Sequence, residues 1–256
     1  TDITLYEVEL VSADNAIAIA LEASRRLKED ELKDIRESLQ ALGEPPIQCW
    51  WKVGKNGQFR RLDEGADELY LNVPRDLKFR FKPGQFIQVN GEINTKMVDQ
   101  MLRLVSPSSS GVAVDLFCGA GNLSLPLAKQ FDQVIGVEGL NSLVAGAAQN
   151  AIENEITTAQ FFTADLTQKN SLNKIKEIPK SLDLVVLDPP RSGAIDIMPW
   201  VAKSGAKQVI YISCHPSTMV RDAKHLLDAG YKMKDLGVLD MFPHTAHVEA
   251  MALFEK

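Results

Sequence analysis

The stretch "MKDLGVLDMFPHTAHVEAMALFEK", residues 233–256, is the most informative part of this chain about its fold. It holds two strand-like runs, 233–242 and 247–256, which are joined only by "PHTA". That link is too short for a crossover helix, so we expect the two runs to pair antiparallel at one edge of a sheet.

Upstream of this hairpin, from about residue 92, strand-like and helix-like patterns alternate. The strand-like runs are 112–117, 133–138, 159–165, 182–188 and 208–214, and the helical patterns are 92–105, 122–131, 141–154 and 218–230. This alternation predicts an α/β fold, with a parallel sheet covered by helices on both faces. A parallel sheet that ends in one antiparallel hairpin resembles the Rossmann-like sheet of S-adenosylmethionine (SAM)-dependent methyltransferases more than that of dinucleotide dehydrogenases.

The first third of the chain has a different texture. Short strand-like runs at 5–10, 16–22, 47–53, 68–73 and 77–81 accompany an amphipathic helix at 28–42 that Gly43 closes. We therefore predict a small α+β domain over 1–90 and a methyltransferase-like domain over 91–256, with a breaker at 106–111.

Composition excludes several classes of protein. The chain has 256 residues and a net charge of −6, so it lacks the basic surplus of many nucleic-acid binders, although a local basic patch is compatible with it. Its cysteines, Cys49, Cys118 and Cys214, form no CxxC pair, which argues against a disulfide framework or a metal or iron–sulfur site within this chain. With no apolar run that could span a bilayer and no secretory signal, we expect a soluble, cytoplasmic protein without an obligate protein partner. A start at Thr1 without methionine is compatible with a fragment of a longer protein.

Four acidic residues lie at or near the ends of neighbouring strand-like runs. They are Asp115, Glu138, Asp165 and Asp188, and we expect them at one edge of the sheet. The stretch "DLFCGAGNLSL" (115–125) adds a glycine turn that lets the backbone approach a ligand. Glu138 is placed to accept hydrogen bonds from ribose hydroxyls, or is simply a solvated loop charge. Each acidic residue alone also suits a helix N-cap or a turn.

Cys214 closes the buried strand-like run that begins at Val209. It is either core packing or a nucleophile near the start of the next helix, with His215 beside it. Glu249 lies in an otherwise apolar final strand and is a candidate proton acceptor, unless it faces solvent. His244 and His247 are weaker acid–base candidates. In "LDPPRSGA" (187–194), two prolines make a rigid shelf that Arg191 follows.

The motifs "DLFCGAGN", "LDPPRSG", "SCHPSTMVRD" and "LDMFPHTAHVEAM", in this order, resemble those of the RNA 5-methyluridine (uracil-C5) methyltransferases. The segments "FIQVN", "NTKMV" and "LDMFPHT" are most similar to members that modify 23S rRNA; the tRNA enzymes come second. The resemblance implies SAM as cofactor, RNA as partner, Cys214 as nucleophile and Glu249 as general base. It implies that these residues surround SAM: Gln88, Phe117, Asn122, Glu138, Asp165 and Asp188.

The resemblance also implies a mechanism. Addition of the Cys214 thiolate to C6 of a flipped-out uracil activates C5, and Glu249 then removes the C5 proton. We expect a lowered pKa for Cys214 and a raised pKa for Glu249.

The chain departs from the family pattern in two respects. His215 stands where the family usually has Asn. The OB-type RNA-binding domain and iron–sulfur cluster of the ribosomal members lie outside this chain, so we expect it to bind RNA weakly. Two other readings stay open: a methyltransferase of a nitrogen atom in which Cys214 is structural, although Arg191 in place of an aromatic residue disfavours an amine substrate, and a non-catalytic RNA-binding module.

Overall fold

The computed structural model describes residues 3–41, 46–62, 69–106 and 111–256. Gly43, Glu68 and most of the predicted breaker at 106–111 lie outside these ranges. The chain divides into two compact units, residues 1–72 with 78–87 and residues 73–77 with 88–256. Among the helices in the described part of the chain, none has the length and apolar character needed to cross a membrane.

Unit 1 is built around a small mixed sheet. Its order is β1-β2-β3-β4, formed by Leu5–Ser12, Ile17–Ala23, Ile47–Val53 and Arg60–Arg61. β1 and β2 pair antiparallel, whereas β2 and β3 are parallel and joined through helix α1 (Glu29–Gln40). Strands β5 (Leu69–Val73) and β6 (Leu77–Phe81) form a separate two-stranded sheet. Cys49 lies in the core of this unit with Leu21, Leu27 and Leu62.

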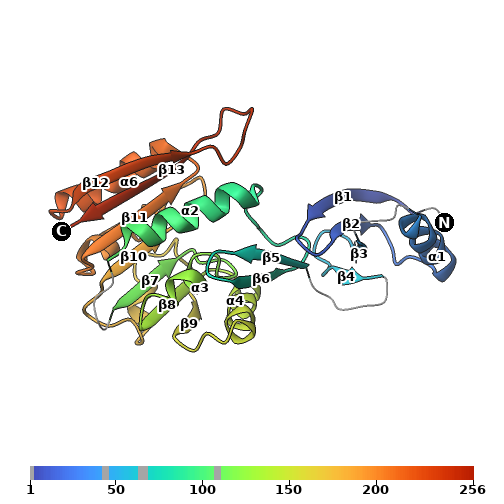
Figure 1. The fold of residues 1–256 in the computed structure, drawn as a ribbon, viewed down its shortest axis with the longest axis horizontal. Coiled ribbons are helices and arrows are strands. Elements are labelled where there is room, and N and C mark those ends of the chain that lie inside the picture. The colour runs from blue at the N-terminus through green and yellow to red at the C-terminus, as the bar shows by residue number, and fades with distance from the viewer. Residues whose placement is uncertain (1–2, 42–45, 63–68, 107–110) are drawn as a thin grey trace. The chain divides into compact units, whose positions relative to one another are not determined.

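Unit 2 contains a seven-stranded sheet of order β12-β13-β11-β10-β7-β8-β9 (Figure 1). The strands are β7 (Val112–Leu116), β8 (Gln133–Glu138), β9 (Ala159–Thr163), β10 (Leu184–Leu187), β11 (Gln208–Ser213), β12 (Lys232–Leu239) and β13 (Glu249–Glu255). The helices are α2 (Gly91–Leu104), α3 (Ser124–Leu127), α4 (Asn141–Glu153), the 3₁₀ turn η1 (Leu172–Lys174), α5 (Met198–Lys203) and α6 (Pro216–Asp228). The predicted α/β fold is confirmed.

The sheet has a topological switch point between β7 and β10. From β7 the chain runs outward through β8 and β9, and it then returns to the other side of β7 and runs through β10 and β11 in the opposite direction. All five strands are parallel. Because such crossovers are right-handed, opposite directions place the connecting helices on opposite faces. In open sheets of this kind, ligands bind beyond the carboxyl ends of the strands at the switch point.

The predicted terminal hairpin is present. β13 inserts between β12 and β11 and pairs antiparallel with both, so β12 forms the edge of the sheet. β13 is buried almost throughout because it is a central strand, whereas most of β12 is exposed. The burial of β13 carries Glu249, its first residue, into the protein, where it is 3% exposed.

Three segments differ from the sequence prediction. The helical pattern at 122–131 gives only the short helix α3, within which Pro126 has no amide hydrogen to donate. η1 and α5 were not predicted, because the stretch between β9 and β10 has no helical periodicity and α5 spans only six residues. These two segments flank an open cavity.

Candidate active site

The carboxyl edge of the sheet brings together residues from four neighbouring strands. Leu187 of β10 pairs with Tyr211 of β11 and with Leu116 of β7, and Leu116 in turn pairs with Val137 of β8. One step further along each strand lie Asp188, Phe117 and Glu138. These three predicted cofactor residues therefore occupy one level of the edge, at and beside the switch point.

The turn after β7 is built for close approach of the backbone to a ligand. Phe117, Gly119 and Gly121 have φ angles of 64°, 56° and 99°. Such a left-handed conformation is unusual for a phenylalanine and ordinary for glycine. A Cβ atom at Gly119 would meet no heavy atom within 4 Å, so the space beside this turn is open.

The Glu138 carboxylate binds this turn from the end of β8. Its Oε2 accepts a hydrogen bond from the Gly119 amide at 3.2 Å, and its Oε1 accepts from the amides of Gly139 at 2.7 Å and Leu140 at 3.1 Å. Each carboxylate oxygen has two lone pairs, so Oε2 has capacity for one more donor, such as a ribose hydroxyl. The arrangement fits the predicted role of Glu138.

The other two acidic residues lie at different depths. Asp115 is the last residue but one of β7, is fully buried, and accepts a hydrogen bond from the Ser124 hydroxyl at 2.5 Å. Burial raises the pKa of Asp115 to about 7, and the charges of Asp188 and Glu138 add to that rise.

Asp165 lies two residues beyond β9 and is exposed. It accepts hydrogen bonds from the Thr167 amide and hydroxyl and from Gln168, and these bonds lower its pKa. The structure therefore does not show Asp165 with the cluster of Asp115, Glu138 and Asp188, and its geometry is that of a turn residue.

Two amide side chains complete the predicted set. Gln88 Nε2 lies 3.5 Å from Asp188 Oδ2, at the limit of a hydrogen bond. Asn122 exchanges two hydrogen bonds with Asn94 of α2, at 2.9 and 3.0 Å, which fixes the segment after the glycine turn to that helix. Asn94 is buried, and sequence reasoning did not select it. Its position among the buried residues Met97, Val98 and Met101 of α2 was the available signal.

Cys214 and Glu249 meet at the end of the pairing between β11 and β13. Ser213 pairs with Ala250, so one further step in this antiparallel register sets Cys214 opposite Glu249. Side chains of opposite residues project from the same face of a sheet. The Glu249 carboxyl accepts no hydrogen bond from any residue that the structure describes, and the buried reading of this residue replaces the solvent-face reading.

Burial and mutual repulsion disfavour the negatively charged forms of the acidic groups at this edge. Burial, followed by the nearby Asp188, raises the pKa of Glu249 to about 8, and burial raises the pKa of Asp188 to about 6. Burial also raises the pKa of Cys214, with the carboxylates of Glu249 and Asp188 contributing and Arg191 opposing them. The expectation of a lowered thiol pKa was therefore wrong, because the sulfur is partly buried and two acidic groups lie near it.

The residues around Cys214 are fixed by backbone hydrogen bonds. The His215 amide donates to Ser213 Oγ at 3.0 Å, and α6 begins directly afterwards at Pro216. The buried Nδ1 of His215 has no hydrogen-bond partner among the described residues. Arg191 Nη2 lies 3.0 Å from His247 Nδ1, which links the "PPRSG" loop to the segment before β13.

A buried aspartate on α6 also holds this loop. Asp222 is fully buried and accepts hydrogen bonds from the Ala194 amide and the Tyr211 hydroxyl, both at 2.6 Å. Arg221 pairs with the other oxygen of Asp222 and donates to the Ser192 carbonyl. Sequence reasoning missed this cluster, although Asp222 lies at helical spacing between the buried Met219 and Leu226.

Comparison with known proteins identifies the family. The family model described as tRNA (Uracil-5-)-methyltransferase matches residues 2–256. The chain belongs to this family. It is 39% identical over 251 residues to the 23S rRNA (uracil(1939)-C(5))-methyltransferase RlmD of Pseudomonas putida, and 41% identical over 252 residues to RlmD of Vibrio parahaemolyticus. The alignments cover 98% of this chain but only 54% and 55% of those relatives, so the chain spans about half their length.

Solved structures confirm the fold. The tRNA (uracil-54, C5)-methyltransferase of Pyrococcus abyssi, solved with S-adenosyl-L-homocysteine, superimposes with a TM-score of 0.79 at 23% identity, over 98% of this chain and 59% of that one. TYW2 of M. jannaschii, solved with AdoMet, gives a TM-score of 0.58 at 13% identity and covers 97% of this chain and 100% of that one. Within the residues that the structure describes, no group of three or more His, Cys, Asp or Glu side chains could hold a metal ion.

Proposed function

We propose that the chain is the catalytic part of a SAM-dependent RNA methyltransferase that acts on C5 of uracil. The observation that carries this proposal is the juxtaposition of Cys214 and Glu249 beside Asp188 at the carboxyl edge of the sheet. Carbon methylation of uracil needs a thiol and a carboxyl group, and the two lie on one face, at the same edge of the sheet as the open glycine turn.

The residues around the switch point fit SAM. Glu138 has a free acceptor position toward a ribose, and the open space at Gly119 admits a ligand against the backbone. We assign Phe117, Asn122, Asp188 and Gln88 to the same site, and we retain Asp165 as the weakest member because its oxygens already serve a turn. When bound, SAM supplies an electrophilic methyl group.

The chain's own residues perform the remaining chemistry. Cys214 first releases its proton to solvent water. Its thiolate then adds to C6 of the uracil and forms a carbon–sulfur bond, and the electron pair displaced from the C5–C6 double bond makes C5 nucleophilic. After C5 has gained the methyl group, Glu249 takes the C5 proton. The electron pair of that bond restores the double bond and expels Cys214. Glu249 accepts the C5 proton in its carboxylate form, and its raised pKa, about 8, makes that carboxylate a stronger base than an ordinary one.

We propose 23S rRNA as the substrate, because the RlmD relatives at 39% and 41% identity are named for it. A tRNA substrate is the second candidate, supported by the fold of the P. abyssi enzyme and by the family description. The nitrogen-methylation hypothesis is less well supported, since it gives no role to a buried carboxyl opposite Cys214.

A methylation assay tests the proposal. The chain is incubated with SAM and either a 23S-derived uridine hairpin or a tRNA T-arm hairpin, and digested RNA is analysed for 5-methyluridine by mass spectrometry. We expect product with the 23S hairpin, and a loss of about a thousandfold or more in Cys214→Ala. Cys49→Ala, in the core of unit 1, is the matched control. Methylation that survives in Cys214→Ala would point to a nitrogen substrate and defeat the proposal.

A further inference from the structure

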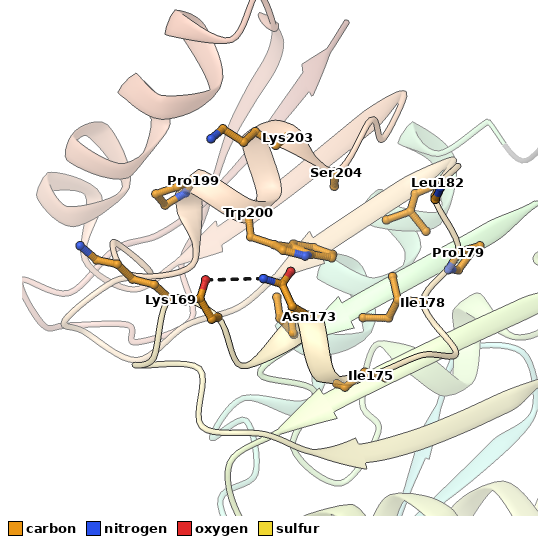
Figure 2. A pocket seen from close by; sticks show the side chains of 13 residues that line it. Lys169, Asn173, Ile175, Ile178, Pro179, Leu182, Pro199, Trp200, Lys203 and Ser204 are labelled. Atoms are coloured by element: carbon orange, nitrogen blue, oxygen red, sulfur yellow. Dashed lines mark hydrogen bonds between the residues drawn. The ribbon is translucent and has the colours of Figure 1, made fainter.

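Unit 2 holds an open cavity of about 850 Å³ that shares no residue with the candidate active site. The segment between β9 and β10 forms one wall, and α5 with Ser204 forms the other (Figure 2). This volume lies within the usual range for small-molecule sites, roughly 300–1,000 Å³. The lining includes no aspartate or glutamate.

The charged side chains that line the cavity are all lysines. Lys169, Lys180 and Lys203 line it, all three are exposed, and none forms an ion pair with a residue that the structure describes. The segment 169–180 carries four lysines against one acidic residue, Glu177, in a chain whose net charge is −6. A local excess of unpaired lysines in an acidic chain favours an anionic ligand.

The cavity also offers an aromatic surface. Trp200 is partly exposed. It packs against the main core together with Ile175 and Ile178, and this packing fixes the position of its side chain. Figure 2 shows its indole ring projecting from α5 toward Asn173 and Ile178, with Lys169 and Lys203 on the two walls. Nucleic-acid bases stack on such rings in a way that tolerates any sequence, and amide side chains such as that of Asn173 can bond to base edges.

We propose that this cavity binds a nucleotide of single-stranded RNA, with its base against Trp200 and its phosphates beside Lys169, Lys180 and Lys203. The proposal rests on the proposed function, which supplies RNA as the substrate. The nucleotide would belong to a strand that flanks the target uridine. An acidic peptide would match the charge of the cavity but would leave the indole without a stacking partner, so we favour RNA.

A paired charge reversal tests this site. Affinity of the full chain for a fluorescein-labelled single-stranded RNA of about 12 nucleotides is measured by fluorescence anisotropy at several salt concentrations. Lys169→Glu/Lys203→Glu is compared with Lys232→Glu/Lys234→Glu, which alters two exposed lysines of β12 that have no ion pair among the described residues. Both variants change the net charge equally.

We expect the cavity variant to weaken binding by about tenfold with a shallower salt dependence, and the β12 variant by less than about threefold. Photo-crosslinking with 4-thiouridine RNA should give adducts on peptides that contain Asn173 or Trp200. Equal effects of the two variants, crosslinks only elsewhere, or equal competition by polyglutamate would overturn the proposal. Because these readouts do not need methyl transfer, a wild-type chain that binds RNA here but forms no 5-methyluridine would instead overturn the proposed function.

Discussion

At the end of β11, the protonation states of two residues determine what the site can do. Cys214 and Glu249 face each other with raised pKa values, so the resting pair is mostly uncharged near neutral pH. A neutral pair can be buried at little cost, whereas a thiolate beside a carboxylate is strongly disfavoured. A positively charged ligand at this edge would lower both pKa values and so prepare the thiolate that the proposed reaction needs.

Replacing the proposed base should trap the reaction part-way. In Glu249→Gln, Cys214 can still add to C6 and C5 can still be methylated, but nothing removes the C5 proton. We expect a covalent chain–RNA adduct to accumulate with ordinary uridine RNA and SAM, visible as a shifted band on a denaturing gel. The double variant with Cys214→Ala should show no such band. A Glu249→Gln variant that turns over normally would remove Glu249 from the mechanism.

The same substitution should change the pH dependence of stability. Glu249 keeps its proton up to a pH of about 8 in the folded chain but loses it near its ordinary value of 4.5 in the unfolded chain. Between these values the folded state binds the extra proton, so stability falls as the pH rises. Glu249→Gln removes this dependence.

We therefore expect Glu249→Gln to match the wild type at pH 4 and to exceed its free energy of unfolding by about 1–4 kcal/mol at pH 9. Calorimetric unfolding of both proteins at the two pH values is the measurement. A difference that stays the same at both would show that the Glu249 carboxyl has an ordinary pKa.

For single residues, the sequence did not predict how deeply each acidic side chain is buried. Asp115, Glu138 and Asp188 lie near one another as expected, but Asp115 is buried inside β7, one residue before its end, and Asp165 lies two residues beyond β9, outside this group. Strand ends cannot be placed to within two residues from sequence patterns, and two residues separate a buried carboxyl from an exposed turn. The direction of the Cys214 pKa shift was missed because it depends first on burial of the sulfur and then on Glu249 and Asp188, which come from other parts of the chain.

At the scale of elements, α6 positions the loop that follows Asp188. Asp222 joins α6 to β11 through Tyr211 and to the loop through Ala194. Gly193 has a φ of 78°, and a Cβ there would lie 2.5 Å from Asp222 Oδ2, so the loop packs directly against this carboxylate. The loop carries Arg191, whose charge acts on Cys214.

Asp222→Asn should therefore destabilise unit 2. An amide in place of the carboxylate loses the charge-assisted bonds to Arg221 and leaves one buried donor without an acceptor, at a cost of about 2–4 kcal/mol. Urea denaturation followed by circular dichroism measures the loss. Asp228→Asn, an exposed aspartate of the same helix that pairs with Lys224, should cost less than about 0.5 kcal/mol. Equal losses would mean that Asp222 does not hold the loop.

Prediction of the elements succeeded where hydrophobic periodicity was clear. β3, β6 and β8 have the predicted bounds, because alternating or continuous apolar runs between turn residues define them. Prediction failed for α3, which is shorter than its pattern, and for η1 and α5, whose segments are too short to show a period. The cavity that contains Trp200 lies between η1 and α5, so it could not be predicted from the sequence pattern.

In the whole molecule, the order of the strands brings motifs that are far apart in the sequence to one edge of the sheet. The return of the chain from β9 to β10 creates the switch point, and the antiparallel insertion of β13 beside β11 brings Glu249 to Cys214. The sequence predicted the parallel sheet and the terminal hairpin, but it did not predict that β13 would be the inner strand of that hairpin. The division into domains at residues 90 and 91 stays a prediction.

The proposed attack of Cys214 on C6 of uracil in RNA is tested by covalent trapping. The chain is incubated with SAM and a 23S-derived hairpin that carries 5-fluorouridine at the target position, and the product is analysed by denaturing gel and mass spectrometry. A base cannot remove fluorine from C5 as it removes a proton, so the adduct cannot be resolved. We expect a methylated adduct on Cys214 that is absent in Cys214→Ala. An equal yield of adduct in Cys214→Ala, or 5-methyluridine formation from ordinary RNA with no adduct from the fluorinated RNA, would contradict it.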